Sequence, residues 1–93
     1  MTRNKPDSNK AEIVAAIRQL GAAWVDMGRE AGFDGLLLYR GKLHIVEIKH
    51  PDTRFDLTPH EREIQLQAHL QEVDYCVITS VEEAVTLLNE AVT

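Results

Sequence analysis

The sequence predicts an α/β domain with the order helix, three strands, helix, strand and helix, in which helices flank a mixed central sheet. Three observations predict it. Apolar residues recur at helical spacing over residues 8–20. Two apolar runs, residues 33–39 and 43–49, flank a glycine turn. Residues 58–61 carry a helix-start signal. At 93 residues the chain supports one core, so we expect a single domain, residues 8–93, after a flexible N-terminal tail, residues 1–7.

A capping residue and a glycine mark the ends of the first helix, and a short apolar run marks the first strand. Asp7 or Ser8 can cap a helix that ends at Gly21. We expect its inward residues to be Ile13, Val14, Ile17 and Leu20. The apolar residues 22–27 then predict a short strand, and residues 28–32 predict a flexible turn.

Turn and capping signals organise the rest of the chain. Strands two and three form a hairpin through residues 40–42, and Pro51 keeps the polar loop 50–56 out of helix and sheet. Thr58-Pro59-His60-Glu61 is a capping box with proline at the first helical position, opening a helix to about Glu72. Residues 74–79 predict a strand, and Ser80-Val81-Glu82-Glu83 is a second capping box that opens the last helix.

The hairpin carries the candidate chemistry. Glu47 and Lys49 are two residues apart in one strand, so their side chains share a face. Asp34 opens the preceding strand at the end far from the turn, and antiparallel pairing brings it back toward Glu47. Glu47 lies in the apolar run Ile45-Val46-Glu47-Ile48, where an unpaired charge is costly. Two carboxylates and an ammonium are therefore expected in one small volume.

Carboxylate pairs of this kind favour a divalent cation. Two neighbouring carboxylates repel unless a cation lies between them, and oxygen ligands suit Mg²⁺ or Mn²⁺. Such an ion activates water and neutralises charge on a phosphate, while a nearby lysine orients the water or stabilises the transition state. We therefore expect Asp34 and Glu47 to bind Mg²⁺ or Mn²⁺, with Lys49 catalytic, in phosphodiester hydrolysis.

Asp34 followed by Glu47-Ile48-Lys49 resembles the D…(D/E)-x-K signature of the PD-(D/E)XK nuclease superfamily, and looks most similar to its VRR-NUC branch. Phe33 stands where the superfamily name expects proline, and Glu61 stands where the branch has glutamine. The resemblance implies a restriction-endonuclease-like αβββαβ core, here with one extra C-terminal helix. It also implies that the backbone carbonyl of Ile48 completes the protein metal ligands.

The resemblance implies further site residues and a substrate. Glu12, on the first helix, would support the metal through water. Gln65, one helical turn after Glu61, would replace the contact of the family glutamine with phosphate or water. Relatives without extra domains look like dimers that act on branched DNA, so we expect a homodimer and a preference for four-way junctions.

Charge is unevenly distributed along the chain. The formal net charge is −5, but all ten lysines and arginines lie within residues 1–62. A bound cation would tilt the DNA-facing side positive. We expect this side to carry Lys49, His50, Arg54 and Arg62.

Other classes of function have less support in the sequence. The sequence contains no P-loop, no GxGxxG and no zinc-ligand spacing. The alternative function is a non-catalytic DNA-binding or assembly module that retains the fold, and a more remote one is a structural protein with an incidental acid cluster. No apolar run approaches the ~20 residues of a spanning helix. Because no secretion signal is recognisable and Cys76 is a lone cysteine, we expect the cytoplasm, of a bacterial host if a phage encodes the chain.

Overall fold

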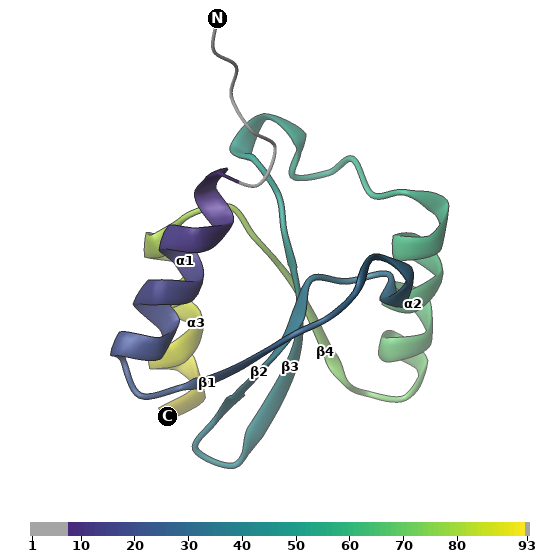
Figure 1. Ribbon diagram of the computed structural model, residues 1–93. Coiled ribbons are helices and arrows are strands. Elements are labelled where there is room, and N and C mark those ends of the chain that lie inside the picture. Colours follow the sequence, from purple (N-terminus) through teal and green to yellow (C-terminus); the bar gives the residue numbers. More distant parts are fainter. Residues whose placement is uncertain (1–7, 93) are drawn as a thin grey trace, which may run out of the picture.

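The computed structural model describes residues 8–92, so the expected flexible tail lies outside the described residues. Three α-helices, four strands and two short 3₁₀ turns follow one another along the chain (Figure 1). In order they are α1 (Ser8–Gln19), β1 (Ala23–Asp26), η1 (Arg29–Ala31), β2 (Gly35–Tyr39), β3 (Lys42–Ile48), η2 (Pro51–Thr53), α2 (Pro59–Leu70), β4 (Asp74–Ile78) and α3 (Val81–Val92). The predicted order of helices and strands is confirmed.

The four strands form one mixed sheet in the order β1-β2-β3-β4. The first three strands are antiparallel neighbours, and β4 pairs parallel to β3. The β2–β3 hairpin turns at Arg40 and Gly41, which both have positive φ angles. Gly35 pairs with Val46, so the start of β2 lies beside the end of β3, as the hairpin prediction requires.

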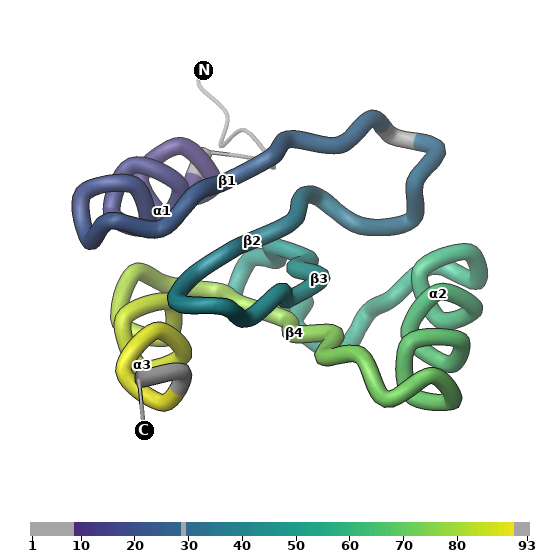
Figure 2. Tube along the Cα trace, turned by 90° about the horizontal axis from the view of Figure 1, so that it is seen from below, coloured from purple at the N-terminus to yellow at the C-terminus, as the bar shows by residue number. Residues whose placement is uncertain are grey.

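The helices lie in two layers on either side of the sheet. Helices α1 and α3 lie side by side on one face, and α2 lies on the other (Figures 1 and 2). The main core fills the space between the sheet and the α1/α3 layer. Its fully buried members include Ile13, Ile17, Leu37, Val46 and Ala84. On the opposite face α2 packs against β4.

Capping contacts set the helix starts largely as predicted. Thr58 and Glu61 form the complete reciprocal capping box of α2. At α3 the Ser80 Oγ accepts from the Glu83 N–H at 3.1 Å, but the Glu83 carboxylate accepts from the Thr79 N–H at 2.7 Å. Only one of the two hydrogen bonds of the predicted second capping box is therefore formed, because the Glu83 carboxylate accepts from the N–H of Thr79 instead of that of Ser80.

Three local predictions need correction. Pro51 does not exclude helical structure, since it occupies the first turn of η2, where its missing N–H costs nothing. Helix α2 ends at Leu70 rather than at Glu72, which has a φ of 61°. Leu20 lies beyond the end of α1 with 46% of its surface exposed, so it does not join the core.

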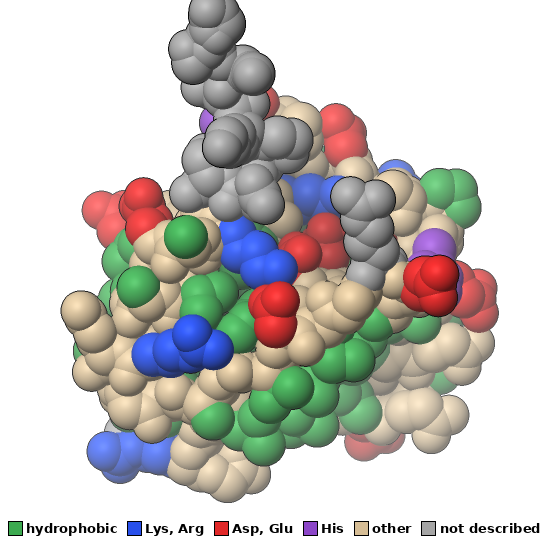
Figure 3. Space-filling model, viewed as in Figure 1, with side chains coloured by type: hydrophobic (Ala, Val, Ile, Leu, Met, Phe, Trp, Pro, Cys, Tyr) green, Lys and Arg blue, Asp and Glu red, His purple; other side chains and the backbone are tan. Residues whose placement is uncertain are grey.

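Part of the sheet face toward α2 is uncovered. Val25, Leu38 and Leu43 alternate with the buried Trp24, Leu37 and His44, and all three are more than 40% exposed. Leu38 and Leu43 are direct cross-strand partners. Figure 3 shows hydrophobic side chains across the lower middle of the view, where the strands lie in Figure 1. We call Val25, Leu38 and Leu43 the open sheet face.

Among the described residues, none of the helices is both long enough and apolar enough to cross a membrane. Each α-helix has only 12 residues, whereas a membrane span takes about 20.

Gly35 leaves room for the Trp24 ring to pack directly against strand β2. A Cβ at this position would lie 2.2 Å from the Trp24 ring, whereas a Cβ at Gly28 would meet nothing within 4 Å. Because the ring is buried, Gly35→Ala should lower the free energy of unfolding by about 1–3 kcal/mol. Urea unfolding of Gly35→Ala beside the control Gly28→Ala measures this. Equal stability of the two variants would show that the core accommodates the methyl group.

Candidate metal and catalytic site

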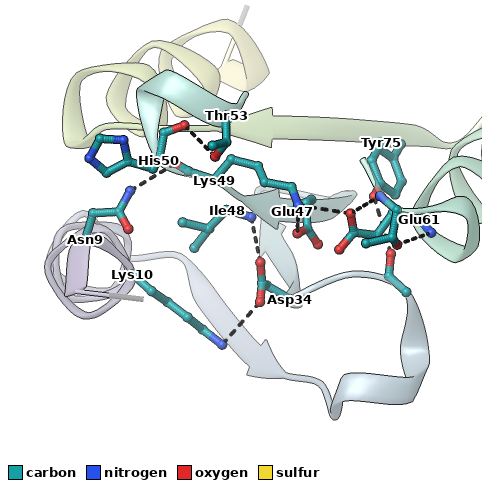
Figure 4. Close-up of polar contacts among 12 residues, drawn as sticks. Asn9, Lys10, Asp34, Glu47, Ile48, Lys49, His50, Thr53, Glu61 and Tyr75 are labelled. Carbon is teal, nitrogen blue, oxygen red and sulfur yellow. Dashed lines mark hydrogen bonds and ion pairs between the residues drawn. The ribbon is translucent and has the colours of Figure 1, made fainter. Parts of the chain in front are cut away.

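Asp34 and Glu47, the two predicted metal ligands, converge at one end of the sheet (Figure 4). The Asp34 N–H donates to the Val46 carbonyl at 2.9 Å, which fixes Asp34 beside the end of β3. Asp34 Oδ2 accepts from the Ile48 N–H at 2.7 Å, directly after Glu47 in the chain. Glu47 is 5% exposed and lies on the face of β3 that is turned toward α2. The hairpin therefore brings Asp34 and Glu47 together as predicted.

Lys49 joins the hairpin to α2. Its Nζ lies 3.5 Å from Glu47 Oε2 and 3.0 Å from Glu61 Oε1. The same Glu61 oxygen accepts from the Thr58 N–H at 2.8 Å, so the capping box holds it in place. The Asn9 amide donates to the Lys49 carbonyl at 3.0 Å and fixes the backbone from the side of α1. Hydrogen bonds and charge from Glu61 and Glu47 outweigh the opposing effect of burial, so the pKa of Lys49 is raised.

Glu47 has the most perturbed acidity of the site. Burial, then the negative charges of Asp34 and Glu61, raises the pKa of Glu47 to about 8. Glu61 differs, because its hydrogen bonds from Thr58 and Lys49 more than offset burial and leave its pKa lowered. The two glutamates share a hydrogen bond when Glu47 is protonated. A raised carboxyl pKa means that the neighbouring cations do not fully stabilise the carboxylate charge. A further cation nearby would stabilise it.

Helix α1 contributes a lysine that the sequence analysis missed. Lys10 Nζ lies 3.6 Å from Asp34 Oδ1 and 3.2 Å from Asp26 Oδ1. Glu12 lies two residues further along, on an exposed part of α1, so the supporting role predicted for it stays a prediction. Helical spacing alone does not say which residue of the first turn faces the strand ends. The packing of α1 on β1 decides it.

Tyr75 is a second missed neighbour. Its hydroxyl donates to the Gly32 carbonyl at 3.3 Å, so it ties β4 to the loop that precedes Asp34. Burial and the nearby charges of Glu47, Glu61 and Asp34 raise its pKa. No motif signals this residue in the sequence, because its proximity depends on the pairing of Tyr75 with Ile45 across β3 and β4.

A pocket of about 300 Å³ opens onto the acids. Its lining combines the charged groups Lys10, Asp34, Glu47 and Glu61 with the loop residues Gly28, Gly32 and Phe33. Gln65 does not line it. That residue is exposed on α2 and lines two hollows beside Arg62. Glu61, not Gln65, is the α2 residue that contacts Lys49.

The predicted DNA-binding residues fall into two groups. His50 and Arg62 are exposed, whereas Lys49 has 15% of its side chain exposed and pairs with Glu47 and Glu61. Arg54 instead pairs with Glu83 and donates to Thr79 Oγ1 at 3.0 Å, so it braces the loop after β3 against the start of α3. The His50 ring accepts from the Asp52 N–H at 3.2 Å and caps η2. Arg54 therefore has a structural partner that its sequence position did not indicate.

The donor set fits a divalent cation with few protein ligands. Asp34 and Glu47 supply carboxylate oxygens, and the raised pKa of Glu47 shows that its charge lacks sufficient compensation. Among residues 8–92, no three side chains of His, Cys, Asp or Glu form a complete metal-binding group. Mg²⁺ is commonly held by one or two carboxylates and keeps several waters. Asp34, Glu47 and the Ile48 carbonyl are the residues that would hold it.

Comparison of the chain with protein-family models, with curated proteins and with solved structures gave no match.

The raised pKa of Glu47 predicts an unusual pH dependence. The unfolded chain loses this proton near pH 4.5 and the metal-free folded protein near pH 8, so the folded state binds more protons between these values. The contribution of Glu47 to the free energy of unfolding should therefore fall as the pH rises from about 4.5 to about 8. Urea unfolding of wild type and Glu47→Gln across this range should show the variant gaining relative stability with pH.

The exposed Glu82→Gln is the matched control, since it removes one carboxylate from α3 without touching the site. A constant difference between wild type and Glu47→Gln at all pH values would contradict a raised pKa for Glu47.

Proposed function

We propose that the protein is a metal-dependent endodeoxyribonuclease of the PD-(D/E)XK type, similar to VRR-NUC domains. The observation that carries the proposal is the convergence of Asp34, the buried Glu47 and Lys49 at one end of the β2–β3 hairpin. The order of elements and the mixed four-stranded sheet are compatible with an αβββαβ core followed by one extra helix. Burying a carboxylate among other acids is costly, and a metal site is a functional reason to keep it.

Each site residue has a distinct role. Asp34, Glu47 and the Ile48 carbonyl would hold Mg²⁺ or Mn²⁺, which supplies an activated water and neutralises charge on the phosphate. Lys49 would orient the attacking water and stabilise the developing negative charge. Glu61 would keep the ammonium of Lys49 in place, since its own carboxylate is anchored by the capping box. Glu12 and Gln65 would have supporting roles.

DNA would approach the end of the sheet that carries Lys49, His50 and Arg62. Phosphate contacts by cationic groups supply much of the affinity of DNA-binding proteins. Arg54 would contribute mainly by fixing the loop, because its guanidinium already pairs with Glu83. Helix α3 carries Glu82, Glu83 and Glu90 and is an unfavourable surface for phosphates.

A homodimer would explain the open sheet face. Exposed apolar surface of this kind marks an interaction site, and Val25, Leu38 and Leu43 belong to three adjacent strands. Leu43 and Glu47 lie on the same face of β3 but at opposite ends of the strand. A second copy that covers Leu43 would therefore leave the acids at the other end accessible. Two sites related by a two-fold axis suit the arms of a four-way junction.

The alternative is a DNA-binding or assembly module without catalysis. The ion pairs of Lys10 and Lys49 favour it, because the carboxylates already have cationic partners without a metal. A binder would need only the basic residues, whereas the nuclease needs Asp34, Glu47 and an added divalent ion.

The first test concerns Lys49. Lys49→Ala should lower the rate of Mn²⁺-dependent DNA cleavage about 100-fold or more without weakening Mn²⁺ binding, because the lysine acts in the transition state. Asp34→Asn should lose cleavage together with most of the thermal stabilisation by Mn²⁺. Cleavage assays and calorimetry measure these two effects.

Lys42→Ala, at the exposed start of β3, is the control that loses the same charge outside the site. Metal-independent cleavage, or cleavage by Lys49→Ala at the wild-type rate, would defeat this mechanism.

The second test concerns assembly. Wild type should be a dimer by light scattering and should cut a four-way junction faster than a linear duplex of the same sequence. Leu38→Glu should give a monomer, because it places a charge in the centre of the open sheet face. The junction preference should fall with it.

Leu20→Glu adds the same charge at a leucine of similar exposure next to α1, so it should remain dimeric. A wild-type monomer that cuts both substrates equally would leave the nuclease proposal intact and remove the junction-resolving role.

A further inference from the structure

Lys10 connects the candidate metal site to a carboxylate outside it. Its ammonium lies 3.6 Å from Oδ1 of Asp34, a proposed metal ligand, and 3.2 Å from Oδ1 of Asp26, which is not one. Figure 4 shows the Lys10 side chain reaching from α1 to Asp34. One cation thus holds an acid of the site and an acid beside it at the same time.

We propose that Lys10 is a displaceable counter-ion: it neutralises Asp34 in the metal-free protein and pairs with Asp26 alone when a divalent cation binds Asp34. This inference rests on the proposed metal site. It gives Lys10 a positioning role that tunes metal affinity, and it gives Asp26 the role of the alternative partner.

Competition for Asp34 is the first step of the argument. Asp34 Oδ2 already accepts from the Ile48 N–H, so Oδ1 is the oxygen that faces Lys10. An ammonium and a divalent cation repel each other strongly at such short separation. Metal binding at Asp34 is therefore favoured when the Lys10 ammonium moves away, and the flexible four-carbon stem of lysine allows this.

Asp26 is suited to receive the displaced ammonium. Its Oδ1 is already the nearer of the two acceptors. The Trp24 Nε1–H donates to the same oxygen at 3.0 Å, so a buried residue holds the carboxylate in place independently of Lys10. The Asp26 side chain is 65% exposed, which leaves room for the ammonium to rotate outward without losing its partner. Because the Trp24 hydrogen bond holds Asp26 and the Asp26 side chain is open to solvent, moving the Lys10 ammonium from Asp34 to Asp26 costs little free energy.

The arrangement also explains how the acids coexist without metal. Lys49 compensates Glu47 and Glu61, and Lys10 compensates Asp34. The two lysines differ in where their acidic partners lie. Both partners of Lys49, Glu47 and Glu61, line the pocket, whereas Asp26, one of the two partners of Lys10, does not. Of these two cations, only Lys10 has a partner to which it can withdraw from the site.

Titration calorimetry with Mn²⁺, with all variants at one pH and one salt concentration, tests the competition. Lys10→Gln should bind Mn²⁺ about two- to fivefold more tightly than wild type, the range expected for losing one partly exposed ion pair. Lys42→Gln is the matched control, since it removes the same charge from a lysine at the exposed start of β3, at the hairpin end of the strand and away from the site. It should leave the Kd near the wild-type value.

A double-mutant cycle tests the role of Asp26. Asp26→Asn should weaken Mn²⁺ binding about two- to fivefold in wild type, because Lys10 then has no partner other than Asp34. The same substitution in the Lys10→Gln background should have a much smaller effect. Equal effects in both backgrounds, or a Lys10→Gln variant with unchanged Kd, would overturn the counter-ion role and leave the metal site standing. A wild type that binds no Mn²⁺ would overturn both.

Discussion

The burial of the Glu47 carboxyl is the constraint around which the rest of this structure is arranged. The residue lies in a strand with 5% of its surface exposed, close to two other acids. A carboxylate in such a place is expensive unless cations and hydrogen bonds surround it. Lys49 and the capping box of α2 supply part of that compensation, and the raised pKa of Glu47 shows that the compensation is incomplete. A further positive charge, such as the proposed divalent cation, would complete this compensation.

Strand β3 carries two different surfaces along one face. Leu43 lies at its open, apolar end and Glu47 at its buried, acidic end, with Ile45 between them. Helix α2 packs on the neighbouring β4 and reaches the acidic end through Glu61, while the hairpin end stays uncovered. This separation would let one face of the sheet serve the proposed metal site and the proposed dimer interface without either obstructing the other.

The balance of charge at the site is local and does not follow the net charge of −5. Two lysines from different directions, Lys10 on α1 and Lys49 after β3, hold three acids together. Arg54 is paired with Glu83, so the basic surface available to the proposed DNA substrate is smaller than the count of cationic residues suggests. A bound divalent ion would matter for DNA affinity as well as for chemistry, because it adds positive charge where phosphates approach.

The sequence by itself determined the order of the elements, the hairpin that joins Asp34 to Glu47, and the capping box of α2, because turns, alternation and caps depend on neighbours in the chain. It also placed Glu47 and Lys49 on one face. Only the tertiary structure decided that Lys10 contacts the acids, that Glu61 rather than Gln65 meets Lys49, and that Arg54 pairs with Glu83. Those contacts join elements far apart in the sequence, so they depend on how the helices rotate and pack against the sheet, which no local pattern specifies.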